Sequence, residues 1–224
     1  MDEQSVSLPG RCTDISVQKK KADRVSLYVE NAFLDGFHRD VIENAGIRKG
    51  DLITPDLYDR LVGAERQFRL NSQIYRWLAV RNHSCGEIIA KSRAKGYTRE
   101  EAEKALQPFL EKGYVDDVVF AESFTRDKSE RHGWGPAKIR RALAQKGIKK
   151  HYIDAALENI FTGRQLNDAL EAVAGSVAKR LMRAEPGLKR KKKLVDFLIR
   201  RGFPGHIVME KCDELLKKLE NEEL

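Results

Sequence analysis

Two glycines flank a tryptophan in the segment GWGPAKIRRALAQKGI, residues 133–148, and a basic run follows them. Glycines beside a lysine can cradle phosphate groups, so the segment is first a candidate nucleotide site. A P-loop needs the pattern G-x-x-x-x-G-K-[ST], and Lys138 lacks that frame. A dinucleotide fingerprint needs a third glycine and a preceding strand, and the segment has neither signal. We therefore interpret it as a helix start, with Gly135 as the N-cap and Pro136 at the first helical position.

Other residues that could do chemistry are scattered or fit helix caps better. The 5 histidines show no H-x-x-x-H or H-E-x-x-H spacing. The adjacent Asp116 and Asp117 suggest a metal site but fit a helix N-terminus better, where acids cap amides and favour the dipole. HSCGE, residues 83–87, places a cysteine beside a histidine, yet Ser84 and Glu87 have the spacing of a capping box. We expect no enzyme activity, no metal and no cofactor.

Positive charge is the strongest functional signal. The run LKRKKK, residues 188–193, is the densest cluster and falls at a helix start, where the dipole disfavours cations. Such residues contact phosphates or carboxylates, or else they are an ordinary solvated charge run. The candidate partner-binding residues are Lys138, Arg140, Arg141, Lys146, Lys189, Arg190, Lys191, Lys192, Lys193, Arg200 and Arg201. Trp134, in the linker, is either a packing anchor between modules or an exposed contact residue.

Composition limits the classes of protein that remain. The chain has 224 residues, of which 34% are charged, and its formal net charge is +8. A basic surface favours polyanions such as nucleic acid or an acidic protein groove. The absence of a run of about 18 apolar residues argues against a transmembrane helix, and the acidic start MDEQSVSLPG argues against a secretory signal. Three distant cysteines without C-x-x-C favour a reducing cytoplasm over a disulfide framework or a zinc site.

A repeat organises the chain beyond residue 65. AKGY, QKGI and RRGF each place a basic residue, a glycine and a large apolar residue together, and their glycines, Gly96, Gly147 and Gly202, are 51 and 55 residues apart. Apolar spacing by four on both sides predicts one face of each of two helices, with the glycine as the C′ residue of the first. The aligned positions are Ile88, Ile139 and Leu194, then Ser92, Leu143 and Leu198, then Ala102, Ile153 and Val208, then Leu106, Leu157 and Cys212.

A preceding helix completes each unit, at about residues 65–81, 116–131 and 166–184. The sequence thus predicts a mainly α protein of tandem three-helix repeat modules in an elongated arrangement, with a small β-containing N-terminal extension. The extension, residues 1–60, holds two or three antiparallel strands joined through the charged tract 19–23, a short helix at 39–45, and a long helix that starts at Thr54-Pro55. The three modules are then residues 61–113, 114–165 and 166–224.

The segment GYVDDVVFAESFTRDKSERHGWGPAKIRRALAQKGI, residues 113–148, resembles the central signature of the RecX regulatory proteins. Lys138, Ile139, Leu143 and Lys146 match that pattern, and the other two modules match it more loosely. The tandem three-helix architecture and the β-prone N-terminus are also similar to the family. The signature positions, to which we assign a mostly structural role, are Asp116, Asp117, Phe120, Ala121, Gly133, Trp134, Gly135 and Gly147.

The resemblance implies a regulator of homologous recombination and DNA repair. Such a protein binds the RecA recombinase, or its single-stranded-DNA filament, and modulates its ATPase and strand exchange, in most members of the family by inhibition. The implied partners are RecA, its nucleoprotein filament and single- or double-stranded DNA, with no membrane partner, and we expect a monomer. Two other interpretations stay open: a stand-alone basic DNA-binding protein with helix-turn-helix-like modules, and a helical-repeat adaptor with an unrelated partner.

Overall fold

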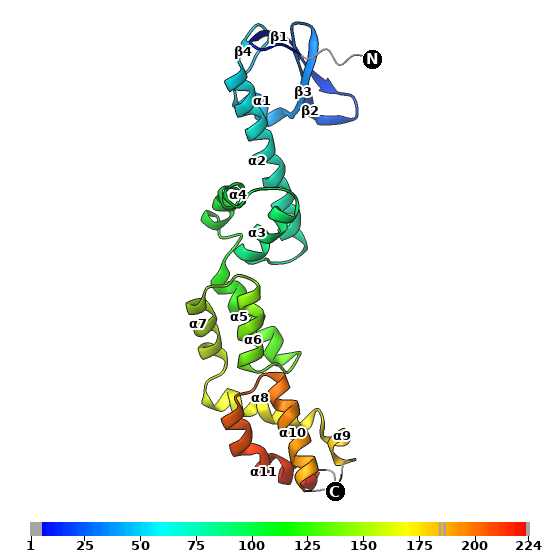
Figure 1. The fold of residues 1–224 in the computed structure, drawn as a ribbon, viewed down its shortest axis with the longest axis vertical. Coiled ribbons are helices and arrows are strands. Elements are labelled where there is room, and N and C mark those ends of the chain that lie inside the picture. The colour runs from blue at the N-terminus through cyan, green and yellow to red at the C-terminus, as the bar shows by residue number, and fades with distance from the viewer. Residues whose placement is uncertain (1–5, 184, 186, 223–224) are drawn as a thin grey trace. The chain divides into compact units, whose positions relative to one another are not determined.

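The structure is a computed structural model, and it describes residues 6–183, 185 and 187–222. Eleven helices and four strands form within these ranges (Figure 1). Their internal contacts divide them into two compact units. Unit 1 contains the residues up to 81 together with 92–108, and unit 2 contains residues 82–91 together with those from 109 onward. The division of the chain into the four segments given above stays a prediction.

An antiparallel sheet of four strands opens unit 1, in the order β3-β2-β1-β4. The strands are β1 Gly10–Gln18, β2 Lys21–Val29, β3 Ala32–His38 and β4 Leu52–Ile53. Val25, Leu27 and Val29 of β2 are buried, as their alternation predicts. Glu30 and Asn31 both have positive φ, the turn geometry that matches the twist of a two-residue hairpin.

Two details of the predicted sheet were wrong. The charged tract 19–23 is not all connection, because β2 already begins at Lys21. The strand β4 was missed, since two residues, paired as Gly10 with Ile53 and Arg11 with Leu52, are too short to give a periodic signal.

Two helices complete this part of unit 1. The helix α1, Arg39–Asn44, ends as predicted before Gly46, which has a φ of +69°. The helix α2, Pro55–Val80, begins as predicted at Thr54, whose Oγ1 accepts a hydrogen bond from the Leu57 amide at 3.2 Å. The predicted boundary at residue 60 falls inside this unbroken helix, and the core beneath the sheet includes Leu61.

The rest of the chain is helical (Figure 1). Its helices are α3 Cys85–Ala94, α4 Arg99–Glu111, α5 Asp117–Glu130, α6 Pro136–Gln145, α7 Lys150–Ile160, α8 Gly163–Gly175, α9 Ala178–Met182, α10 Leu188–Arg201 and α11 Gly205–Glu222. In chain order these helices, with α2, fall into two sets of three and one of four: α2, α3 and α4; α5, α6 and α7; and α8 to α11. The single helix predicted at 166–184 is instead two helices, α8 and α9. The Ser176 hydroxyl donates to the Val173 carbonyl at 2.6 Å at this break, a local bond that competes with the helix ladder.

The predicted repeat is confirmed in its details. All twelve aligned positions are buried. Gly96, Gly147 and Gly202 have φ angles of +84°, +78° and +95°, so each is the left-handed residue that ends its helix. The residue after the glycine returns over that helix end: the Ile148 amide donates to the Leu143 carbonyl at 3.2 Å. Phe120, Ile139, Leu143 and Leu157 belong to one core in the second set of helices, whereas a separate core in the third set contains Leu194 and Leu198.

Candidate partner-binding surface

The helices of unit 2 are joined through paired glycines. The Gly135 amide donates to the Arg201 carbonyl at 2.8 Å, and the Ala137 amide donates to the Gly202 carbonyl at 2.9 Å. The free amides at the start of α6 are therefore bonded to the free carbonyls at the end of α10, and the ends of the two helix dipoles that meet are opposite in sign. We call this contact the α6–α10 joint. At this joint the third set of helices contacts the second directly, backbone to backbone, with no side chain between them.

A second joint of the same kind links α3 to the end of α6. A Cβ on Gly86 would lie 2.8 Å from the α-carbon of Gly147, so the two backbones touch. The Ser84 hydroxyl donates to the Lys146 carbonyl at 2.7 Å, and the Lys146 ammonium pairs with Glu87 at 2.5 Å. We call this contact the α3–α6 joint. The α6–α10 joint has a similar contact, because Arg201, the basic residue before Gly202, also bonds the preceding set of helices. Its guanidinium donates to the His132 carbonyl at 2.7 Å.

The acidic and cysteine motifs have structural roles. The Asp116 carboxylate caps α5, accepting from the Val118 and Val119 amides at 2.7 and 3.1 Å, as predicted. Asp117 instead accepts from the Cys85 amide at 2.9 Å and so caps the neighbouring helix α3. Burial first, and the Asp117 carboxylate second, raise the pKa of the Cys85 thiol to about 12, which keeps it protonated and a poor nucleophile.

The capping box opening α3 is also confirmed. The Glu87 amide donates to the Ser84 hydroxyl at 3.1 Å, and the Glu87 carboxylate accepts from the Ser84 amide at 3.4 Å. Within the described residues, no three His, Cys, Asp or Glu side chains gather to hold a metal ion. No helix in the same ranges is long and apolar enough to cross a bilayer.

Trp134 is a packing residue. Its ring meets Phe124 edge-on at 6.4 Å between centroids and packs against the core of the second set of helices. The Lys138 ammonium lies 4.3 Å from the centre of the same ring. Lys138 is therefore half-buried between Trp134 and Gly202 and is less available to a partner than the sequence suggested.

Several other predicted contact residues are engaged inside the protein. Arg140 pairs with Asp154, and Lys191 pairs with Asp213, whose hydrogen bond raises the pKa of that ammonium. Arg190 corrects the view of LKRKKK as one solvated run. Its side chain is only 10% exposed, and it bonds the Glu220 carboxylate at 2.6 Å and the Met182 carbonyl at 3.3 Å.

Four of the predicted cations remain exposed and form no ion pair with any residue that the structure describes: Arg141, Lys192, Lys193 and Arg200. Lys189 is exposed as well and pairs with the exposed Glu185 at 2.7 Å. Lys189, Lys193 and Arg200 follow one another by four and seven residues, so they lie along one side of α10. We call Lys189, Lys192, Lys193 and Arg200 the α10 basic face; the exposed Asp196 lies within it.

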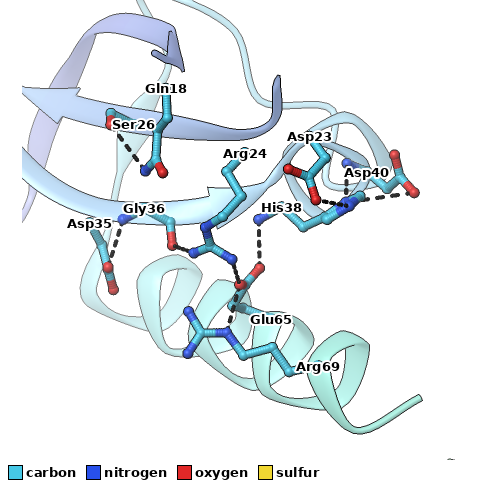
Figure 2. A network of polar contacts seen from close by, with 10 residues as sticks. All are labelled: Gln18, Asp23, Arg24, Ser26, Asp35, Gly36, His38, Asp40, Glu65 and Arg69. Atoms are coloured by element: carbon cyan, nitrogen blue, oxygen red, sulfur yellow. Dashed lines mark hydrogen bonds and ion pairs between the residues drawn. The ribbon is translucent and has the colours of Figure 1, made fainter. Parts of the chain in front are cut away.

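A polar network in unit 1, centred on a buried carboxylate, was not predicted from the sequence (Figure 2). Glu65 of α2 is 5% exposed and accepts from the Arg24 guanidinium at 2.6 Å, the His38 amide at 2.6 Å and the Arg69 guanidinium at 2.8 Å. Arg24 also donates to the Gly36 carbonyl. Burial on its own raises the pKa of Glu65, but these hydrogen bonds outweigh it and lower that pKa below its ordinary value. The only local signal was the spacing of Glu65 and Arg69 by four.

The fold is that of a helical-repeat protein with a small N-terminal sheet. Profiles of known families identify two parts of the chain: the RecX second three-helix domain matches residues 116–157, and the regulatory protein RecX N-terminal domain matches residues 10–54. A "Regulatory protein RecX" from Chlorobium phaeobacteroides is 32% identical over 147 residues, covering 63% of this chain and 90% of the relative. Another, from Clostridium acetobutylicum, is 26% identical over 208 residues, covering 92% and 96%.

Solved structures agree on the fold. A crystal structure of regulatory protein RecX superposes with a TM-score of 0.73 at 22% identity, covering 89% of this chain and 97% of that one. RecX from Lactobacillus salivarius superposes with a TM-score of 0.59 at 18% identity, covering 70% and 98%. The chain belongs to the RecX family of regulatory proteins.

Proposed function

We propose that this protein binds the RecA recombinase on its single-stranded-DNA filament and inhibits ATP hydrolysis and strand exchange. Membership of the RecX family, whose curated relatives are named regulatory proteins, is the observation that carries the proposal. Catalysis is not part of it, because the cysteine and acidic motifs serve as caps and joints. The protein acts instead by occupying a surface of its partner.

The joints support a docking role for unit 2. Backbone-to-backbone contacts at both joints fix α3, α6 and α10 relative to one another, so cations on these helices are presented at a set spacing. Individually weak contacts then add, because the first contact raises the effective concentration of the others. We assign this docking to Arg141 and the α10 basic face, which would meet acidic protein or DNA phosphate on the filament.

A RecA assay tests the proposal. The single-stranded-DNA-dependent ATPase of RecA is measured with increasing amounts of this protein or of the variant K192Q/K193Q. We expect the wild-type chain to inhibit, and the variant to need about tenfold more protein, the effect of roughly 1.4 kcal/mol of lost interaction. The control K179Q/K217Q removes two other exposed lysines of the third set and should inhibit like the wild type.

Two outcomes contradict the proposal. An unchanged RecA ATPase at saturating wild-type protein means that the partner is not RecA. Tight, salt-sensitive binding to naked duplex DNA that accounts for the whole inhibition supports the stand-alone DNA-binding alternative. Equal inhibition by wild type and K192Q/K193Q leaves RecA as partner and removes those two lysines from the interface.

A further inference from the structure

A cationic cleft lies in unit 1, beside the Glu65 network. Its volume is about 750 Å³, within the range of ligand sites. Its lining residues come from three parts of unit 1: β2 and β3, α2, and the turn between α3 and α4. The cations that line it come from all three parts: Lys21, Arg24, Arg69, Arg76 and Lys95.

The positive charge of the cleft exceeds what the protein itself neutralises. Glu65 binds Arg24 and Arg69 together, so these two guanidinium groups share one carboxylate (Figure 2). Lys21, Arg76 and Lys95 are exposed, and none forms an ion pair with another described residue. Asp23 is the one carboxylate among the lining residues, and it is 65% exposed and directed toward His38 at 3.7 Å. Three positive charges therefore remain for an anionic ligand.

The cleft is extended along a helix rather than closed around a point. Arg69, Ser72, Gln73 and Arg76 line it at intervals of three and four residues, which places them on one side of α2. Seven residues of helix rise about 10 Å, the length of about three nucleotides in a stacked strand at roughly 3.4 Å each. The two arginines thus lie at opposite ends of a stretch that carries one hydroxyl and one amide between them.

Aromatic rings accompany the cations. Phe68, which stacks on His38 with 3.9 Å between ring centroids, lines the cleft, and so does Tyr97. Rings next to a basic groove are the combination that binds single strands, because bases stack on rings while phosphates meet arginine and lysine. An acidic peptide would pair with the same cations, but it has no planar bases to place against the rings.

We propose that this cleft binds a single strand of nucleic acid through about three consecutive phosphates, held by Arg69, Arg76, Lys95 and Lys21. The hydroxyl of Ser72 and the amide of Gln73 hydrogen-bond the sugar and base edges. This site and the α10 basic face share no residue. The site does not depend on the proposed action on RecA, because it is tested with no RecA present.

The test measures the anisotropy of a short fluorescein-labelled oligothymidylate titrated with the full chain at several salt concentrations. K21Q/R76Q/K95Q removes the three cations without ion pairs and leaves the Glu65 network intact. We expect its affinity to fall at least tenfold at low salt. The logarithm of the binding constant falls linearly with log salt, and each lost phosphate contact makes this slope less steep by about 0.7. The slope for the variant should therefore be less steep by about 2. The control K49Q/R60Q/K104Q removes the same charges elsewhere in unit 1, from exposed residues outside the cleft, and should keep the wild-type slope.

Four results would overturn the proposal. The first is equal oligothymidylate binding by wild type and K21Q/R76Q/K95Q, and the second is an equal loss in the control, which indicates nonspecific attraction. The third is tighter, cleft-dependent binding of a labelled polyglutamate peptide, which indicates an acidic protein instead. An abasic strand of the same length should bind more weakly than oligothymidylate; equal binding would contradict the stacking on which the choice of nucleic acid rests. Circular dichroism spectra of all variants establish that they are folded.

Discussion

Gly135 and Gly202, which begin α6 and end α10, are in direct backbone contact: a Cβ on Gly135 would lie 2.5 Å from the Gly202 carbonyl carbon. Neither position has room for a side chain, although only Gly202 has a φ that itself requires glycine. The 2.8 and 2.9 Å hydrogen bonds beside this contact depend on the close approach. The second and third sets of helices can therefore approach this closely only because both positions lack a side chain.

Adding one methyl group should weaken the α6–α10 joint. In G135A the new Cβ meets backbone atoms that cannot rotate away, so we expect unit 2 to lose about 1–3 kcal/mol of stability. G175A is the matched control, since a Cβ there meets nothing within 4 Å and an alanine favours the helix by about 0.5–1 kcal/mol. Urea unfolding followed by circular dichroism measures both. If G135A unfolds at the same urea concentration as G175A, the joint is looser than described.

Glu65 should make unit 1 sensitive to acid. Its folded-state pKa lies below the ordinary 4.5, so its contribution is present above that pH and is lost as the pH falls through the folded pKa. E65Q removes the charge that holds Arg24 and Arg69, and we expect it to cost about 3 kcal/mol at pH 7. Urea unfolding should show that the difference in unfolding free energy between wild type and E65Q becomes smaller as the pH falls below 4.5. A difference that stays constant across this range would contradict the role of the carboxylate charge.

Cys85 should resist alkylation in the folded protein. A pKa near 12 instead of the ordinary 9.0 leaves about a thousandfold less thiolate at neutral pH. Iodoacetamide labelling followed by peptide mass spectrometry should therefore be slow at Cys85 and become fast when urea unfolds the chain. D117N removes the second cause of the shift and should label faster than the wild type. Equal rates for native and unfolded protein would exclude the raised pKa.

Lys138 and Trp134 should stabilise the second set of helices as a pair. K138Q keeps the aliphatic stem against Gly202 but removes the charge over the ring, at an expected cost of about 0.5–1 kcal/mol. Because W134L removes the ring, K138Q should cost nothing further in that background. Urea unfolding of the two single variants and the double variant gives this coupling energy. Strictly additive effects would show that the ammonium and the ring do not interact.

The helices could be predicted because their signals are local. Spacing by four around Gly96, Gly147 and Gly202 fixed both the phase and the ends of the paired helices, and the cap at Thr54 fixed the start of α2. The strand β4 had no such signal in two residues. The break between α8 and α9 lies at Ser176, a residue that the helical pattern tolerates.

The partner-binding residues were harder to predict, because burial depends on distant contacts. Arg190, Leu194 and Leu198 follow at intervals of four, which would have placed Arg190 on the buried side of α10, but four flanking lysines suggested solvent instead. The contact of Gly86 with Gly147 joins residues 61 positions apart and leaves no local pattern. The cleft likewise combines α2 with two strands and a turn that no local pattern places beside it.

The third repeat has a different start from the first two. Counted back twelve residues from the helix-ending glycine, the positions are Ser84, Gly135 and Arg190, and ten residues back they are Gly86, Ala137 and Lys192. In the first two repeats, small residues at these positions contact the end of the corresponding helix in the next set. In the third repeat long cations hold the same positions, and α10 begins three residues earlier, relative to its glycine, than α6 does. The backbone-to-backbone contact that Gly86 and Gly135 make with the next glycine therefore has no counterpart at the start of α10, where long charged side chains hold the equivalent positions.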